Sequence, residues 1–173
     1  MDLLTSFEGR IMRGRFWLGS VLSFALMLAL YLIVNQIFGG IVETTMPAAE
    51  GELPQMTVNK TAMIVWTLVG LIPAYMFFAV AAKRAHDRGK SAKWLLLFVP
   101  GWLFSIYQNI VMLGGDGDVM AMMMDPTMLT LQMIVGVISL GVMIWWLVDL
   151  GILEGREGPN AYGPDPRGAT VAA

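Results

Sequence analysis

Four long apolar runs, none of which contains a formal charge, make up most of the chain. They are 22 to 27 residues long and cover residues 16–42, 61–82, 94–115 and 126–148. A helix needs about 20 apolar residues to cross a bilayer. The pattern therefore predicts an all-α membrane protein, a bundle of four transmembrane helices at about residues 16–40, 61–82, 94–114 and 127–149.

The segments between the runs are short, so we expect a single membrane domain over residues 1–173. It begins with a leader at residues 1–15 and ends with a tail at residues 150–173. Within the second span, Gly70 and Pro73 predict a kink, because proline removes a helical hydrogen bond. We expect no fixed element in the polar loop over residues 43–60, which contains Pro47 and Pro54.

Composition strengthens the membrane prediction and excludes several kinds of site. Charged residues make up 14% of the chain, whereas soluble domains contain about 25%. The chain has no cysteine, which excludes disulfides, thiolate metal sites and cysteine nucleophiles. Its one histidine, His86, cannot form a multi-histidine metal site within one chain. We therefore expect no metal or cofactor, and the net charge of −2 gives no signal for nucleic acid.

Basic residues are concentrated in the leader, in the loop between the second and third runs, and in the tail. A chain that crosses four times places these segments on one side, and they hold ten of the eleven Lys and Arg residues. Cytoplasmic loops carry the excess of basic residues, so both termini are predicted to lie inside. The first run is longer than the ~7–15-residue core of a secretory signal. With no organelle signal visible, a bacterial inner (plasma) membrane is the expected location.

Three polar motifs occur in these predicted cytoplasmic segments. They read G-R-I-M-R-G-R-F-W at residues 9–17, R-A-H-D-R-G-K-S at residues 84–91, and N-A-Y-G-P-D-P at residues 160–166. Their order within a four-span frame resembles the bacterial "domain of unknown function 805" family, YhaH-like small inner-membrane proteins, from about residue 7 to residue 166. The resemblance implies a four-helix inner-membrane protein. It implies no reaction, because the function of the family is not established.

The motif side chains form the candidate site, a structural or binding cluster on the cytoplasmic face. Its members are Arg10, Arg13, Trp17, Arg84, His86, Asp87, Gly89, Ser91, Asn160, Tyr162, Gly163 and Asp165. The tail motif combines many turn-forming residues with a tyrosine, so we expect it to fold back against the leader and the loop. In that position Asn160 and Asp165 are expected to accept hydrogen bonds from arginines of the other two motifs, Arg10, Arg13 or Arg84.

Helix boundaries can also be predicted at the second motif. Glycine often follows the last residue of a helix, so Gly89 is expected to terminate the second span. A serine side chain can accept a hydrogen bond from the first turn of a helix, so Ser91 is expected to cap the third. The two spans should therefore form a tight helical hairpin.

The same residues also suggest a membrane enzyme that acts on a lipid or phosphate group. In that hypothesis His86 transfers a proton, Asp87 orients it, and Arg84 or Arg10 clamps an anion. However, adjacent side chains on a helix point about 100° apart. One histidine and one carboxylate also do not form a nucleophile–base set. We therefore assign no catalytic residue and favour a non-enzymatic protein, while the enzyme hypothesis stays open.

Polar amides lie within the predicted spans, namely Asn35, Gln108, Asn109 and Gln132. A buried amide is costly without a hydrogen-bond partner, so we expect these side chains to pair across the bundle. The alternative is a polar pathway through a small transporter or channel. No charge lies in the middle of a span, which weighs against ion-coupled transport.

Five methionines fall within residues 120–128. Thioethers bind Cu(I), so copper handling is one hypothesis for this loop. Methionine also packs well at irregular interfaces, and we favour that interpretation.

The leading functional hypothesis is an accessory or scaffold protein. It would associate through its cytoplasmic face with another membrane protein, with a second copy of itself, or with anionic lipid. The small size and the absence of cofactor ligands favour this role.

Overall fold

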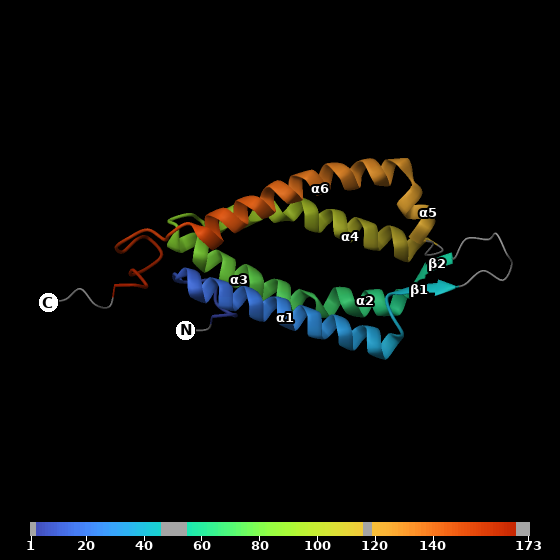
Figure 1. Ribbon diagram of the computed structural model, residues 1–173, viewed down its shortest axis with the longest axis horizontal. Coiled ribbons are helices and arrows are strands. Elements are labelled where there is room, and N and C mark those ends of the chain that lie inside the picture. Colours follow the sequence, from blue (N-terminus) through green and yellow to red (C-terminus); the bar gives the residue numbers. More distant parts are fainter. Residues whose placement is uncertain (1–2, 46–54, 116–118, 169–173) are drawn as a thin grey trace. The chain divides into compact units, whose positions relative to one another are not determined.

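The structure is a computed structural model that describes residues 3–45, 55–115 and 119–168 (Figure 1). It is mostly helical with one small sheet. The elements in chain order are α1 (Arg13–Phe38), β1 (Val42–Thr45), β2 (Gln55–Val58), α2 (Lys60–Val69), α3 (Leu71–Asp87), the 3₁₀-helix η1 (Ala92–Phe98), α4 (Val99–Gly114), α5 (Val119–Met124), α6 (Pro126–Trp146) and the π-helix η2 (Leu147–Ile152).

Four helical segments are long and apolar enough to cross a membrane, as the apolar runs predicted. They are Arg13–Phe38, Lys60–Asp87, Ala92–Gly114 and Pro126–Ile152. The prediction of a mostly helical protein with four membrane-length helices is therefore confirmed. Each run of apolar residues favours a helix of this length, because a helix satisfies its own backbone hydrogen bonds.

The second of these segments is interrupted where the sequence predicted a kink. α2 ends at Val69 and α3 begins at Leu71, with Gly70 between them. Pro73 lies in the first turn of α3 and has no N–H to donate to the carbonyl of Val69. The proline thus explains why the helix breaks one turn before it.

The loop over residues 43–60 contradicts the expectation that it holds no fixed element. β1 and β2 pair antiparallel, with Val42 opposite Val58 and Glu43 opposite Thr57. These short segments are rich in valine and threonine, which favour strands. Asn59 then caps α2, since its Oδ1 accepts the Ala62 N–H at 3.0 Å. Pro47 and Pro54 of this loop lie outside the described residues.

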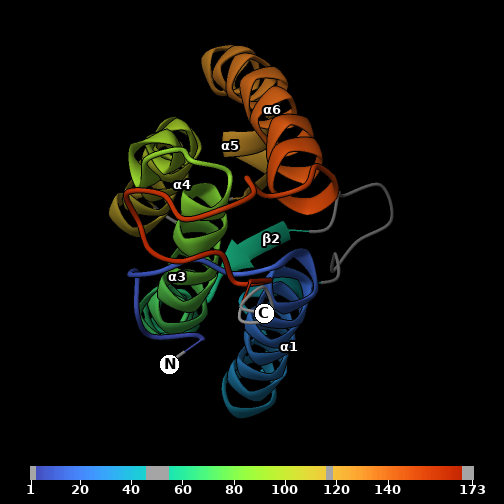
Figure 2. The ribbon, with the colours of Figure 1, turned by 90° about the vertical axis from the view of Figure 1, so that its left-hand side faces the viewer.

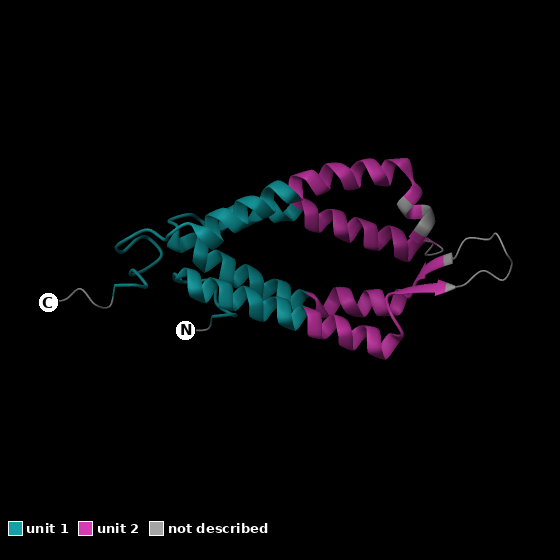
Figure 3. Ribbon diagram, in the orientation of Figure 1, with its two compact units in different colours: residues 1–27, 71–99, 140–173 teal, residues 28–70, 100–139 magenta. Residues whose placement is uncertain are grey.

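The chain packs as two compact units (Figure 3). The first contains residues 1–27, 71–99 and 140–173, and the second contains residues 28–70 and 100–139. All three motifs belong to the first unit. Within it α1 and α3 approach closely, because a Cβ on Gly19 would lie 2.6 Å from Cγ2 of Val80. A buried apolar cluster joins its segments, formed by Ile11, Phe16, Val80, Ala81, Ala82, Ala85, Leu95 and Leu150.

The amides of the second unit do not pair with one another as expected. Asn35 donates to the carbonyl of Tyr31 in its own helix at 2.7 Å. Asn109 lies 3.5 Å from the hydroxyl of Thr67. Gln108 is half-buried and Gln132 is exposed. Among the described residues no hydrogen bond joins two of these four amides. Asn35 bonds within its own helix, and Asn109 contacts α2 through Thr67.

The methionine-rich segment forms the short helix α5 and leads into α6. Asp125 caps α6, because its Oδ1 accepts the Met128 N–H at 2.8 Å. The side chains of Met120 and Met123 lie outside the described residues. The copper and packing hypotheses for these methionines therefore stay predictions.

Candidate functional site

The three motifs meet at one end of the first unit. Figure 2 faces this end and shows the leader and the tail running beside the end of α3. The leader precedes α1, the second motif occupies the last turn of α3 and the loop after it, and the third motif lies in the tail. Residues separated by more than 140 positions in the sequence are in hydrogen-bond contact here.

The centre of the site is the carboxylate of Asp87, the last residue of α3. Oδ1 accepts two hydrogen bonds from Arg10, one from Nε at 3.2 Å and one from Nη2 at 3.1 Å. Oδ2 accepts a hydrogen bond from Nη1 of Arg84. The three side chains are only 1–3% exposed, so they form a buried Arg–Asp–Arg triad. Buried charges need this kind of complete pairing, because removal from water is costly.

Arg10 also ties the tail to the leader through backbone carbonyls. Its Nη2 donates to the carbonyl of Arg156 at 2.6 Å. Its Nη1 donates to the carbonyl of Gly158 at 2.6 Å and to that of Gly163 at 3.4 Å. One guanidinium thus connects the leader, the end of α3 and two turns of the tail.

Arg84 plays the corresponding role at the end of η2. Its Nε donates to the carbonyl of Leu150 at 2.9 Å, and its Nη2 donates to that of Leu153. Its Nη1 also reaches the carbonyl of Ile11 at 3.5 Å. The Leu150 and Leu153 carbonyls lie where the last helix ends, and such carbonyls have no partner within the helix.

Two glycines allow the tail to pack onto this triad. A Cβ on Gly155 would overlap the carboxylate of Asp87, so only glycine lets the tail backbone approach so closely. Gly89 has a φ of +70° and ends the turn after α3, in agreement with the boundary predicted from the sequence. The side chain of Arg156 lies directly over it.

His86 is fixed by both the leader and the tail. Its ring stacks on that of Tyr162, with centroids 3.9 Å apart and planes 3° from parallel. Its Nδ1 lies 3.2 Å from the carbonyl oxygen of Gly9, which can only accept, so Nδ1 carries the proton in this contact. Asn160 donates from Nδ2 to the backbone carbonyl of His86 at 2.9 Å. The histidine is therefore held on its face, on its edge and at its backbone.

Within the described residues, the expected hydrogen bonds from Arg10, Arg13 or Arg84 to Asn160 and Asp165 are not formed. The Oδ1 of Asn160 instead accepts the Tyr162 N–H at 2.8 Å, within its own turn. Asp165 accepts the Gly158 N–H at 2.8 Å and the Arg167 N–H at 2.9 Å. The carboxylate of Asp165 and the amide oxygen of Asn160 thus shape turns within the tail, whereas Arg10 and Arg84 use backbone carbonyls and Asp87.

The tail turn should be sensitive to acid because of Asp165. Hydrogen bonds from the Arg167 side chain and backbone lower the pKa of Asp165 to about 2. A lowered pKa stabilises the fold above the ordinary value near 4, and this stabilisation is lost as the pH falls towards about 2. We expect Asp165→Asn to melt below the parent protein near neutral pH, and the difference to shrink over this acid range. Equal melting temperatures near neutral pH would contradict the role of Asp165.

Arg13 and Trp17 bind the start of α1 to the end of η2 and to the residues just after it. Arg13 donates to the carbonyl of Ile152 at 2.9 Å and to Oε1 of Glu154 at 3.1 Å. The indole N–H of Trp17 donates to the carbonyl of Gly151 at 3.1 Å. A Cβ on Gly151 would lie 2.7 Å from Cζ2 of that indole, so this contact too requires glycine.

The end of α3 and the start of η1 form the predicted turn. Ser91 caps η1, because its hydroxyl accepts the Lys93 N–H at 3.3 Å. With Gly89 before it, the chain reverses within four residues. The hairpin expected between the second and third spans is therefore formed here.

A second buried charge cluster was missed by the sequence analysis. Asp149 in η2 is 7% exposed, and its Oδ1 lies 2.9 Å from Nζ of Lys90 and 3.3 Å from Nη2 of Arg88. The Lys90 ammonium also lies over the rings of Trp94 and Trp145, at 5.4 and 5.5 Å from their centroids. The sequence offered one indication of this cluster, which is that Asp149 directly follows the fourth apolar run.

The fold and this cluster define a small, mostly helical protein with four membrane-length helices and a polar end. The chain belongs to the family described as "Protein of unknown function (DUF805)", which it matches over residues 4–164. The family resemblance carried by the three motifs is thus confirmed.

Two relatives come from Escherichia coli. The chain is 28% identical over 162 residues to the uncharacterized protein YiiR of strain K12, and equally to that of strain O157:H7. Each alignment covers 94% of this chain and 86% of the relative. No solved structure matches the chain.

Proposed function

We propose that this protein is a non-enzymatic accessory or scaffold protein of the bacterial inner membrane. Its cap, defined as the polar end formed by residues 3–17, 84–91 and 150–168, faces the cytoplasm. There it associates with another membrane protein, with a second copy, or with anionic lipid. The observation that carries the proposal is the mutual pairing of Arg10, Arg84 and Asp87 in the buried triad. They hold three segments of the chain together in place of lining a reactive centre.

The surface of the helices supports insertion in a membrane. None of the residues of α6 is buried, and Val137 and Met133 are each 72% exposed. A soluble protein rarely exposes apolar surface on this scale, whereas lipid tails cover it without cost. The basic residues gather in the cap and its loop, which favours a cytoplasmic position for that end.

Reporter fusions test the orientation. Fusions at Gly89 and Ala173 should report the cytoplasm, and fusions at Gly51 and Gly117 should report the outside. The reason is that ten of the eleven basic residues lie on the side of the first pair. A fusion at Gly89 that reads outside would contradict the proposed location of the cap.

The contacts of the motif residues also weigh against catalysis at this end. His86 offers one ring nitrogen to the Gly9 carbonyl and one face to Tyr162. Asp87 accepts hydrogen bonds from two arginines and is 3% exposed, so it is not placed to orient the histidine. A general acid or base must reach the proton that it transfers.

Replacement of His86 distinguishes the scaffold proposal from the hypothesis that the protein is an enzyme. Under the scaffold proposal, His86→Gln should keep expression, fold and cellular function nearly intact, because the amide can still donate one hydrogen bond to the Gly9 carbonyl. An enzyme that depends on His86 should fold normally yet lose activity by ~100-fold or more. The measurement is complementation of a strain that lacks the protein, alongside the melting temperature of the purified variant.

Native purification supplies the corresponding control. The parent protein and His86→Gln are extracted in mild detergent, and the proteins and lipids that accompany them are identified by mass spectrometry. The scaffold proposal expects the same partners with both forms. A well-folded variant that keeps its partners but fails to complement would count against the proposal.

A further inference from the structure

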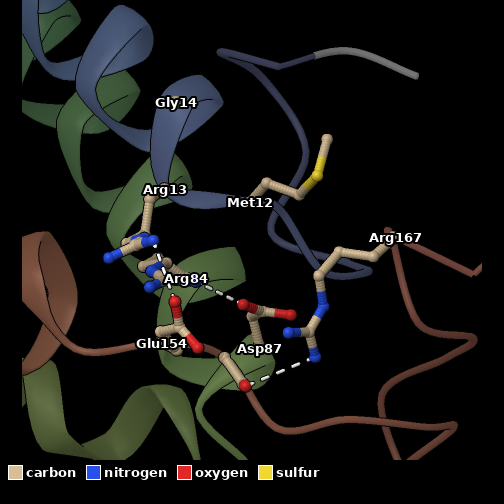
Figure 4. Close-up of a pocket in the computed structure, with 8 residues that line it drawn as sticks. Met12, Arg13, Gly14, Arg84, Asp87, Glu154 and Arg167 are labelled. Atoms are coloured by element: carbon tan, nitrogen blue, oxygen red, sulfur yellow. Dashed lines mark hydrogen bonds and ion pairs between the residues drawn. The ribbon is translucent and has the colours of Figure 1, made fainter.

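A pocket of about 220 Å³ opens beside the buried triad, between the start of α1, the end of α3 and the tail (Figure 4). Its polar walls are formed by Arg13, Arg84, Asp87, Glu154 and Arg167. Figure 4 shows the Arg13 and Arg167 side chains on different sides of this space. The pocket is therefore lined by guanidinium groups that come from three separate segments.

Several guanidinium donors of the pocket have no acceptor in the described part of the chain. Arg13 uses Nη1 and Nη2 for one hydrogen bond each, which leaves three of its five N–H groups. Arg167 uses Nε and Nη2 on Asp165 and Gly155, which leaves both N–H groups of Nη1. The two side chains are 48% and 37% exposed, so they can adjust to a ligand.

The charges around the pocket leave one positive charge in excess. Three guanidinium groups and two carboxylates line it, namely those of Arg13, Arg84, Arg167, Asp87 and Glu154. A phosphate diester carries one negative charge and presents oxygens that guanidinium groups bind in pairs. The charge balance and the unused donors thus fit the same chemical group.

We infer that this pocket binds a phosphodiester group, with Arg13 and Arg167 as its principal ligands. The inference rests on the proposed function for the source of the group, because a cap at the membrane surface meets phospholipid headgroups. A soluble phosphodiester has the same chemistry and would use the same ligands. Binding at this pocket gives the cap its specific contact with anionic lipid.

The test titrates the full chain, purified in an uncharged detergent, with short-chain phosphatidylglycerol and separately with soluble glycerophosphoglycerol. Native mass spectrometry measures the bound fraction, and uncharged diacylglycerol is the reference. We expect Arg13→Gln/Arg167→Gln to weaken phosphatidylglycerol binding by about tenfold or more, as loss of charge-assisted hydrogen bonds implies. Lys93→Gln, which removes an exposed cation that does not line the pocket, should bind like the parent.

A second variant keeps the test decisive if the double replacement fails to fold. Gly14 lines the pocket, and a Cβ placed there meets no atom within 4 Å. Gly14→Leu therefore narrows the pocket without removing a charge, and it should also weaken binding. Saturation by glycerophosphoglycerol as well as by the lipid assigns a soluble source, and saturation by the lipid alone assigns the headgroup.

Two results would overturn the inference. One is parent binding of phosphatidylglycerol no stronger than of diacylglycerol. The other is equal binding by the parent and by a folded pocket variant. Either result leaves the scaffold proposal in place, since that proposal is judged by the fusions and by His86→Gln. If the reporter fusions place the cap outside, the scaffold proposal is wrong. Phosphodiester binding by the protein in detergent can still be measured in that case.

Discussion

Replacement of Asp87 by alanine is expected to lower the free energy of unfolding by about 3–5 kcal/mol, the cost of removing one partner from a buried ion pair. The carboxylate is 3% exposed and balances both Arg10 and Arg84. Without it two buried guanidinium groups face each other with only carbonyl oxygens for compensation. Thermal and denaturant unfolding of the purified protein in detergent measure the loss.

A matched carboxylate in the same cap provides the control. Glu154 also pairs with an arginine, Arg13 at 3.1 Å, but its side chain is 72% exposed. Exposed ion pairs contribute about 0–1 kcal/mol, so Glu154→Gln should unfold nearly like the parent. If Asp87→Ala and Glu154→Gln unfold alike, the triad is not the centre of the cap.

The second large effect is expected for Arg10→Lys, which keeps the charge but removes the planar fork of donors. Arg10 donates to the Asp87 carboxylate and to three tail carbonyls, and one ammonium cannot reach them all. Each buried acceptor left without a donor costs about 1–3 kcal/mol. We expect a total loss of at least about 3 kcal/mol in the free energy of unfolding, measured as for Asp87→Ala.

Arg15 serves as the control for this substitution. It belongs to the same motif and is exposed, and its side chain makes no hydrogen bond to the described residues. Arg15→Lys should therefore leave unfolding unchanged. If Arg15→Lys lowers the free energy of unfolding as much as Arg10→Lys, any change in this motif is destabilising, and the buried guanidinium of Arg10 has no special role.

The sequence predicted the helices well because their signal is local. A charge-free run of bilayer length has few alternatives to a helix, and proline and glycine mark where such a run breaks. The hairpin of β1 and β2 was missed, since two prolines in the loop suggested irregular structure. Its strands, Val42–Thr45 and Gln55–Val58, are each only four residues long and give a weak periodic signal.

The partners within the cap were harder to predict because most acceptors are backbone carbonyls. A carbonyl has no signature in the sequence, so the bonds of Arg10 to residues 156, 158 and 163 could not be foreseen. The motifs showed which groups needed partners but not which partner each would take. For the same reason Asn160 and Asp165 were given arginine donors that they do not use.

The need for glycine at residue 155 was also invisible before the structure. It arises from the approach of the tail backbone to Asp87, 68 residues earlier in the chain. Among nineteen glycines, nothing in the sequence distinguishes this one. Long-range contacts of this kind become clear only when the tail is placed on the end of α3.

The most direct test of the cap is a double-mutant cycle between Arg10 and Asp87, two residues 77 positions apart. Arg10→Gln, which removes the charge, Asp87→Ala and the double variant are unfolded under the same conditions as the parent. Residues in direct contact couple by about 0.5–3 kcal/mol, and a buried charge pair belongs at the upper end. We predict a coupling of at least about 1.5 kcal/mol. The double variant should therefore lose less free energy of unfolding than the two single variants lose together, by at least that amount. Losses that add to within about 0.5 kcal/mol would contradict the claim that this pair joins the leader to α3.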